Sequence, residues 1–129
     1  MPTAIRIEIG KVVLKAELTD GASAKIFLAS LPRQISLSRW GDEYYGTLSV
    51  PVSSGEKRRD VFEVGEVALW PEGNAFCIFF GPTPASRGNE PRMASPGIAL
   101  GRIVADVAVL APLGPRVRMT LKRGAGGIG

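Results

Sequence analysis

Few residues of this chain have side chains that could carry out chemistry. Cys77 is the single cysteine, and the chain contains no histidine. A cysteine nucleophile needs a neighbouring base or positive charge to form its thiolate, and histidine is the usual one. We therefore expect Cys77 to be a buried free thiol. One cysteine without histidine can make neither an internal disulfide nor a structural zinc site, and we predict no metal and no cofactor.

Paired carboxylates occur only at Asp42 and Glu43. Adjacent residues point to opposite faces of a strand or splay apart in a turn, which is poor geometry for glycosidase-type acid and base catalysis. The basic run 57–59 follows Gly55 but lacks the glycine spacing and the Lys-Ser/Thr ending of a phosphate-binding loop. Neither pattern indicates an enzyme class.

Positive charge is concentrated in the second half of the chain. Residues 73–129 hold seven Lys or Arg against two Asp or Glu, whereas residues 1–72 are nearly balanced. Such a half can attract phosphates, or its charges can simply form the outward face of a strand. Because no aromatic-rich basic groove or RNA-binding signature accompanies the charge, nucleic acid is the less favoured partner.

Length and composition bound the class of protein. The chain has 129 residues, 45% of them hydrophobic and 22% charged, which is typical of one globular domain. No apolar run approaches the ~18 residues of a membrane-spanning helix, and residues 1–4 lack the character of a secretory signal. We expect a cytoplasmic protein with no membrane partner, a folded domain over residues 1–123 and a flexible glycine-rich tail over residues 124–129.

The element that organises the chain is the apolar run from Ala75 to Phe80. Turn residues bound it on both sides, at 71–74 and 81–84. A run that is apolar on both faces needs a strand position covered from both sides. We therefore place it at the centre of a closed or sandwiched sheet.

Alternating apolar residues predict the other strands. Ile5, Ile7 and Ile9 share one face, and a two-residue loop at Gly10 and Lys11 predicts a hairpin between 4–9 and 12–18. Further strands are predicted over 34–40, 43–50, 63–70, 98–104 and 116–122. A helix is predicted between an N-cap at Asp20 and a stop at Pro32, a helical turn over 106–110, an exposed loop over 51–60 and an irregular segment over 81–96. Seven or eight short strands with so little helix favour a mainly β fold that closes into a barrel.

The order of these elements resembles the small prokaryotic proteins with a cyclophilin-like β-barrel. The resemblance runs over residues 4–122 and is strongest at the turn 40–43, at 63–86, at 94–95 and at 101–104. It implies a closed eight-stranded cyclophilin-like barrel with short helices capping its ends. It also implies a group with no established activity.

Cyclophilins themselves are peptidyl-prolyl isomerases, and part of their signature has a match here. Their spaced arginine, phenylalanine and glutamine correspond to Arg39, Tyr44 and Thr47, with threonine a departure from the long amide. An arginine that donates a hydrogen bond to the proline nitrogen weakens the amide resonance responsible for a barrier of ~18–20 kcal/mol. The resemblance thus makes Arg39 the candidate catalytic residue. The alternative is a surface ion pair with an adjacent acid, and we predict a carboxylate beside Arg39.

The paired phenylalanines of the cyclophilin proline pocket resemble Phe79 and Phe80, although 76–77 is an alternative register. The alternative role for both is barrel core. Met93, in the long irregular segment, is placed at one edge of the same pocket. The histidine and the Trp-Leu pair that complete the family's pocket have no match after residue 105.

We therefore predict a side groove that binds a short peptide or small ligand without efficient catalysis, with Tyr44, Thr47, Phe79, Phe80 and Met93 as ligand-binding candidates. A proline-containing peptide or a small molecule is the expected partner, and the oligomeric state stays open. One alternative is a weak peptidyl-prolyl isomerase that uses Arg39. Another is an interaction module that uses the basic C-terminal strand.

Overall fold

The structure, a computed structural model, describes residues 3–52 and 55–124 of the chain. Strands dominate this part of the chain, and two short helices accompany them. The helices are α1 (Ala22–Ala29) and the 3₁₀-helix η1 (Val107–Leu110). The strands are β1 (Thr3–Ile9), β2 (Val12–Leu18), β3 (Arg33–Arg39), β4 (Glu43–Thr47), β5 (Arg59–Val61), β6 (Glu66–Trp70), β7 (Ala75–Phe79), β8 (Arg92–Ile103) and β9 (Arg116–Arg123).

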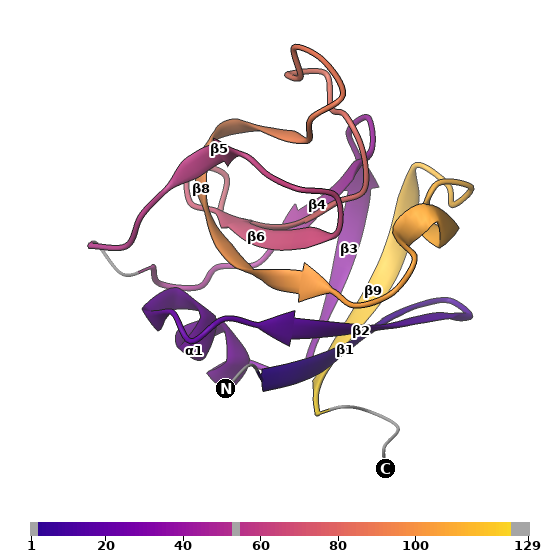
Figure 1. Ribbon diagram of the computed structural model, residues 1–129. Helices are drawn as coiled ribbons and strands as arrows, with labels where there is room; N and C mark the ends of the chain where they lie inside the picture. Colours follow the sequence, from indigo (N-terminus) through magenta and orange to yellow (C-terminus); the bar gives the residue numbers. More distant parts are fainter. Residues whose placement is uncertain (1–2, 53–54, 125–129) are drawn as a thin grey trace.

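Eight of the strands form a closed ring. They follow the order β2-β1-β9-β3-β4-β7-β6-β8, and the antiparallel pairing of β2 with β8 closes the circle. The short β5 lies outside the ring and pairs with the first part of β8 (Figure 1). The predicted mainly β class with eight strands in a closed arrangement is confirmed.

The hairpin at the N-terminus forms as predicted. Ile9 pairs with Val12, and Gly10 takes the left-handed conformation with φ 59°, which glycine adopts without steric cost. This register turns the alternating apolar residues of both strands inward, among them Ile5, Ile7 and Leu14.

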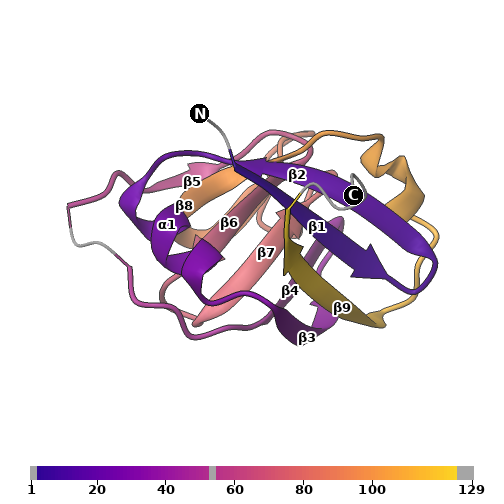
Figure 2. The ribbon, with the colours of Figure 1, turned by 90° about the horizontal axis from the view of Figure 1, so that it is seen from below.

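The two helices close opposite ends of the ring (Figure 2). From α1, Phe27 enters the interior and stacks on Phe76 of β7, with ring centroids 5.3 Å apart. From η1, Val107 and Leu110 join the same core. The N-cap of α1 is Gly21 rather than the predicted Asp20. Gly21 has no side chain, and the Ser23 N–H in the first turn donates instead to the Glu56 carboxylate at 2.9 Å.

Strand β7 is buried along its whole length, because two separate apolar clusters cover its two faces. Phe76 and Ile78 point into the ring, whereas Ala75, Cys77 and Phe79 point outward. The outward residues are covered by a second cluster that includes Phe62 and Met93. Double coverage of this run is therefore confirmed, and it comes from a chain segment folded over the outside of the ring.

That covering segment corrects two predictions. Strand β5 begins at Arg59, inside the exposed loop predicted over 51–60, and β8 begins at Arg92 rather than at residue 98. The prediction failed because Pro96 was taken to forbid regular structure up to that point. Pro96 instead lies in β8, between Arg92 and Gly97, where the pairing with β5 shifts register. At such an irregularity the strand does not need the backbone N–H that proline lacks for an inter-strand hydrogen bond.

The rest of the predicted irregular segment is an ordered loop. The Thr83 hydroxyl donates to the Arg92 carbonyl at 2.5 Å, and the Ser86 hydroxyl donates to the Glu90 carbonyl. The Glu90 carboxylate accepts from the backbone N–H groups of Arg87 and Gly88, which lower its pKa to about 2 together with further hydrogen bonds. The Thr83 bond joins the loop to β8, and the other bonds fix the shape of the loop itself.

Smaller differences concern strand ends and the tail. Strand β4 ends at Thr47 rather than at residue 50, and β6 begins at Glu66 rather than at residue 63. The predicted tail begins at Gly124, and residues 125–129 lie outside the part of the chain that the structure describes. Within the described part, no helix has the length and apolar character needed to cross a bilayer.

Candidate functional site

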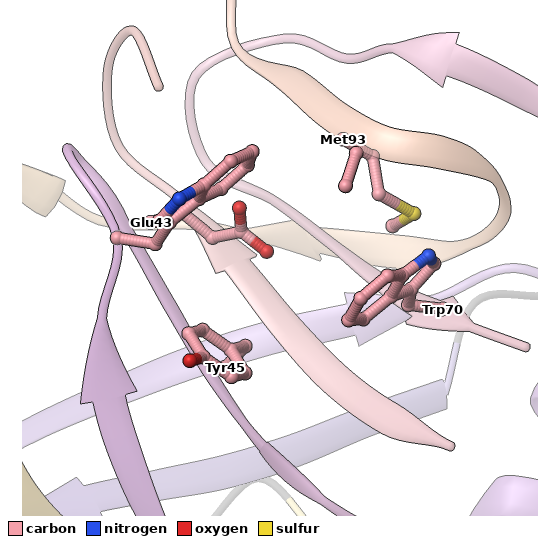
Figure 3. Close-up of a pocket in the computed structure, with 6 residues that line it drawn as sticks. Glu43, Tyr45, Trp70 and Met93 are labelled. Carbon is pink, nitrogen blue, oxygen red and sulfur yellow. The ribbon is translucent and has the colours of Figure 1, made fainter. Parts of the chain in front are cut away.

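A pocket on the outer face of the ring is the candidate site, and we call it the outer pocket. Its volume is about 240 Å³. Its lining comes from β4, from the turn before it, from the end of β6 and from the start of β8, and consists of Trp40, Glu43, Tyr45, Trp70, Met93 and Ala94. Figure 3 shows the Glu43 carboxyl lying between the side chains of Tyr45, Trp70 and Met93.

Strand parity places the β4 side chains. Tyr44 is fully buried in the ring, so Glu43 and Tyr45 point to the other side of the strand. The two-residue turn at Gly41 and Asp42 then brings Trp40 beside Glu43, and their backbones exchange hydrogen bonds of 2.8 and 3.2 Å. Three lining residues thus come from one hairpin.

Small side chains leave room beneath these residues. Tyr45 pairs with Cys77, Cys77 with Ala68, and Ala68 with Ala99, so one cross-strand row carries three small residues in succession. Large side chains in this row would fill the space that the outer pocket occupies.

The start of β8 forms the opposite wall. Gly97 allows its close approach, because a Cβ there would overlap the Met93 side chain and the Leu69 carbonyl. The Trp70 indole N–H donates to the Ser95 hydroxyl at 2.6 Å, which fixes the orientation of the ring. Trp70 of β6 is therefore hydrogen-bonded to β8, and these two strands form this side of the outer pocket.

Glu43 is the unusual member of the lining. Its side chain is 3% exposed, and its Oε1 has no hydrogen-bond partner among the described residues. Burial raises the pKa of its carboxyl to about 7, and a hydrogen bond with the Cys77 thiol only partly opposes that shift. A buried carboxylate without a neighbouring cation lowers the stability of the fold.

A second buried carboxylate on the same outer side shows the ordinary arrangement. Glu66 is 9% exposed, but it accepts two hydrogen bonds from Arg59, at 2.8 and 2.5 Å, and one from the Glu63 N–H at 2.7 Å. The contrast identifies Glu43 as the buried acid whose charge the described residues leave uncompensated.

The Cys77 thiol is fully buried, as expected from the sequence. Burial first, and then the nearby Glu43 carboxyl, raises the pKa of the thiol well above its ordinary value. A protonated thiol shielded from solvent is a poor nucleophile.

Arg39 lies away from the outer pocket, at the end of the ring beside η1. Its guanidinium donates to Asp42 at 2.8 Å, to the Gly41 carbonyl at 2.8 Å, and to the carbonyls of Ala111 and Leu113 at 2.7 and 3.1 Å. The carboxylate predicted beside Arg39 is therefore present. These bonds join the β3–β4 turn to the segment that follows η1.

The other sequence candidates divide between core and surface. Tyr44 lies inside the ring and stacks on Phe80, with centroids 5.6 Å apart, and the Arg39 guanidinium lies 5.0 Å from the centre of the Phe80 ring. Phe79 is buried against Phe62, with centroids 4.8 Å apart. Thr47 is exposed at the end of β4 and does not line the outer pocket.

Of the six candidates, the structure places Met93 in the outer pocket. It meets Tyr45 there, which the cyclophilin spacing sets at a neighbouring pocket position, together with residues that sequence reasoning missed. The outward position of Tyr45 also follows from the sequence. The alternation of Ile35 and Leu37 in β3, carried through the two-residue turn, assigns Tyr44 to the interior and Tyr45 to the exterior. Nothing in the sequence signals that Glu43 is buried, because the cover comes from β8, about fifty residues later.

Within residues 3–52 and 55–124, no cluster of three or more potential metal-binding side chains occurs, at the outer pocket or elsewhere.

Comparisons with known proteins agree with this architecture. A family model described as Cyclophilin-like matches residues 3–121. Among solved structures, the solution structure of a hypothetical protein from Archaeoglobus fulgidus is similar, with a TM-score of 0.78, 31% sequence identity and 95% of each chain covered. No match was found among curated proteins. The resemblance predicted from the sequence is thus confirmed, and the chain belongs to the cyclophilin-like family.

Proposed function

We propose that this cyclophilin-like domain binds a small ligand, or one side chain of a short peptide, in the outer pocket without efficient catalysis. The observation that carries the proposal is the lining itself. Two tryptophans, a tyrosine and a methionine surround a single buried carboxyl. An apolar cavity with few, precisely placed polar groups is the usual form of a small-molecule site.

The size of the outer pocket limits what it can hold. Its volume of about 240 Å³ lies below the range of ~300–1,000 Å³ that is usual for drug-sized ligands. A group no larger than one amino-acid side chain fits that space. A folded partner would have to present a protruding side chain to it.

The contacts of Arg39 favour binding over isomerisation. Four hydrogen bonds already engage its guanidinium with Gly41, Asp42 and two carbonyls near η1. A donor that stabilises a twisted prolyl bond must point at the substrate nitrogen. Arg39 would have to give up these bonds to do so, which supports a structural role for it.

Amide chemical shifts test the binding proposal. We would titrate the ¹⁵N-labelled protein with a blocked Ala-Pro dipeptide and, separately, with a set of small soluble fragments. The expected result is saturable shifts for at least one probe, concentrated at Trp40–Tyr45, Trp70 and Met93–Ala94. Shifts that remain elsewhere on the molecule, or none at all at millimolar probe, would contradict the proposal.

A protease-coupled isomerisation assay on an Ala-Pro peptide tests the catalytic alternative. We expect the wild type and Arg39→Ala to give the same rate, equal to that of the uncatalysed reaction. A wild-type rate above that level, abolished in Arg39→Ala, would favour the isomerase.

The second candidate function is an interaction surface on β9. Arg116 and Arg118 are exposed, lie beside Ser38 and Ser36 of β3, and form no ion pair with a described residue. Basic side chains without acidic neighbours are available to an acidic partner. This candidate predicts salt-sensitive binding to an acidic polypeptide, which can be measured with polyglutamate. Unchanged affinity after reversal of both charges would rule it out.

A further inference from the structure

We propose that the outer pocket is selective for a small organic cation, an alkylated ammonium group, with Glu43 as its counter-ion and the aromatic side chains as its cage. The inference names the ligand class for the proposed binding function and therefore rests on it. The first observation behind it is the charge of the lining. Glu43 is the only charged residue among the described residues that line the outer pocket.

The Glu43 carboxyl lacks the partners that a buried acid normally has. It is 97% shielded from solvent, its Oε1 accepts no hydrogen bond from a described residue, and no described arginine or lysine forms an ion pair with it. Its neighbour Cys77 provides only a weak S–H donor. A bound cation would supply the missing charge in a site where attraction is weakly screened.

The remaining walls suit a weakly hydrated cation. Trp40, Tyr45 and Trp70 contribute three aromatic rings, and Met93 adds a polarizable thioether. Aromatic faces attract cations by ~0.5–2 kcal/mol each, and cages of such rings are used to bind quaternary ammonium groups. Figure 3 shows the Tyr45 and Trp70 rings on either side of the carboxyl.

The hydration of the two kinds of ammonium favours an alkylated ligand over a primary one. Among the lining residues the side-chain oxygens are those of Glu43 and Tyr45, and the indole N–H of Trp70 is already bonded to Ser95. A primary ammonium has three N–H donors and would have to direct all of them at these oxygens, whereas a quaternary ammonium has none. Walls made mostly of carbon therefore replace the hydration of a quaternary ammonium at lower cost.

The chain carries its own reporter for the test. Both of its tryptophans, Trp40 and Trp70, line the outer pocket. Intrinsic fluorescence therefore reports directly on occupancy. We would titrate the protein near pH ~8, where a carboxyl of ordinary or modestly raised pKa is ionised, with choline, with its neutral isostere 3,3-dimethylbutan-1-ol and with ethanolamine.

We expect choline to bind at least ~10-fold more tightly than its neutral isostere, which corresponds to the ~1.4 kcal/mol expected for a single favourable cation contact. We expect it also to bind more tightly than ethanolamine, whose primary ammonium loses more of its hydration. Glu43→Gln should clearly reduce the preference over the neutral isostere, and the aromatic rings should account for what remains. Glu72→Gln, which removes the same charge from an exposed turn, should keep it. Tyr45→Leu, which keeps apolar bulk but removes a ring, should weaken choline binding by ~3–10-fold.

Three other outcomes of the fluorescence titration would contradict the inference. Equal binding of choline and the isostere would reject the cation but would leave the proposed apolar ligand site standing. Tighter binding of ethanolamine would reject the alkylated class. No response to any of the three compounds would reject the inference, and the proposed function would then depend on the amide-shift titration. A far-ultraviolet spectrum and thermal melt of each variant separate loss of binding from loss of fold.

Discussion

Among single residues, Glu43 is the most unusual, because the burial of its carboxyl lowers the stability of the folded state. Glu43 is buried among aromatic side chains, and burial raises its pKa from the usual 4.5 to about 7. An unfolded chain releases this proton near pH 4.5, but the folded chain holds it until about pH 7. Between these values the unfolded state binds fewer protons, so the free energy of unfolding falls as pH rises.

The variant Glu43→Gln removes that pH dependence. A difference of two to three pKa units corresponds to about 3 kcal/mol. We expect the free energy of unfolding of Glu43→Gln, measured relative to wild type, to increase by up to about 3 kcal/mol from pH 4.5 to pH 7 and to stay constant above that. Urea denaturation across this range measures it. A constant difference at all pH values would show that Glu43 has an ordinary pKa.

Arg39 is expected to act on stability. Its guanidinium links the β3–β4 turn to the carbonyls of Ala111 and Leu113. We predict that Arg39→Ala lowers the free energy of unfolding by about 2 kcal/mol, because several charge-assisted hydrogen bonds are lost together. The control is Arg102→Ala, which removes only an exposed ion pair with Glu63 and should cost less than ~1 kcal/mol. Similar costs for the two variants would contradict the structural role.

At the scale of elements, the start of β8 turns a sheet surface into a pocket. Gly97 lets this segment lie against β6, because a Cβ would overlap both Met93 and the Leu69 carbonyl. Gly97→Ala should therefore cost about 1–3 kcal/mol and alter the fluorescence of Trp70. Gly114→Ala is the matched control, since nothing lies within 4 Å of a Cβ at that position. An undisturbed Trp70 signal in Gly97→Ala would contradict this arrangement of the outer pocket.

Elements were easier to predict from the sequence than the site. Alternation of apolar residues identified β1, β2 and β9, and an unbroken apolar run identified the central β7, because strands with one buried face and strands with two each leave a clear pattern. The outer pocket leaves no such pattern. Its residues lie between Trp40 and Ala94, and a turn, a strand end and a proline-containing strand bring them together. The resemblance to cyclophilins also directed attention to Arg39, which donates hydrogen bonds to the segment after η1, and to Tyr44, which is buried inside the ring.

At the scale of the whole molecule, the pairing of β2 with β8 closes the ring. Gly101 lies at this junction, opposite Leu18, and a Cβ there would overlap the Glu17 carbonyl. We predict that Gly101→Ala destabilises the protein more than Gly97→Ala does, because it opens the ring itself. Faster hydrogen exchange of the β2 and β8 amides would accompany the loss of stability. Unchanged protection of those amides would show that the junction tolerates a side chain.

An NMR titration of the Glu43 side-chain carboxyl, without and with saturating choline, would measure both its burial and its role as counter-ion. We expect a pKa of about 7 in the free protein, because the carboxyl is buried without a cation, and a clearly lower value when a cation occupies the outer pocket. A pKa near 4.5 in the free protein would contradict the uncompensated burial. A raised pKa that choline does not change would contradict the assignment of Glu43 as the counter-ion.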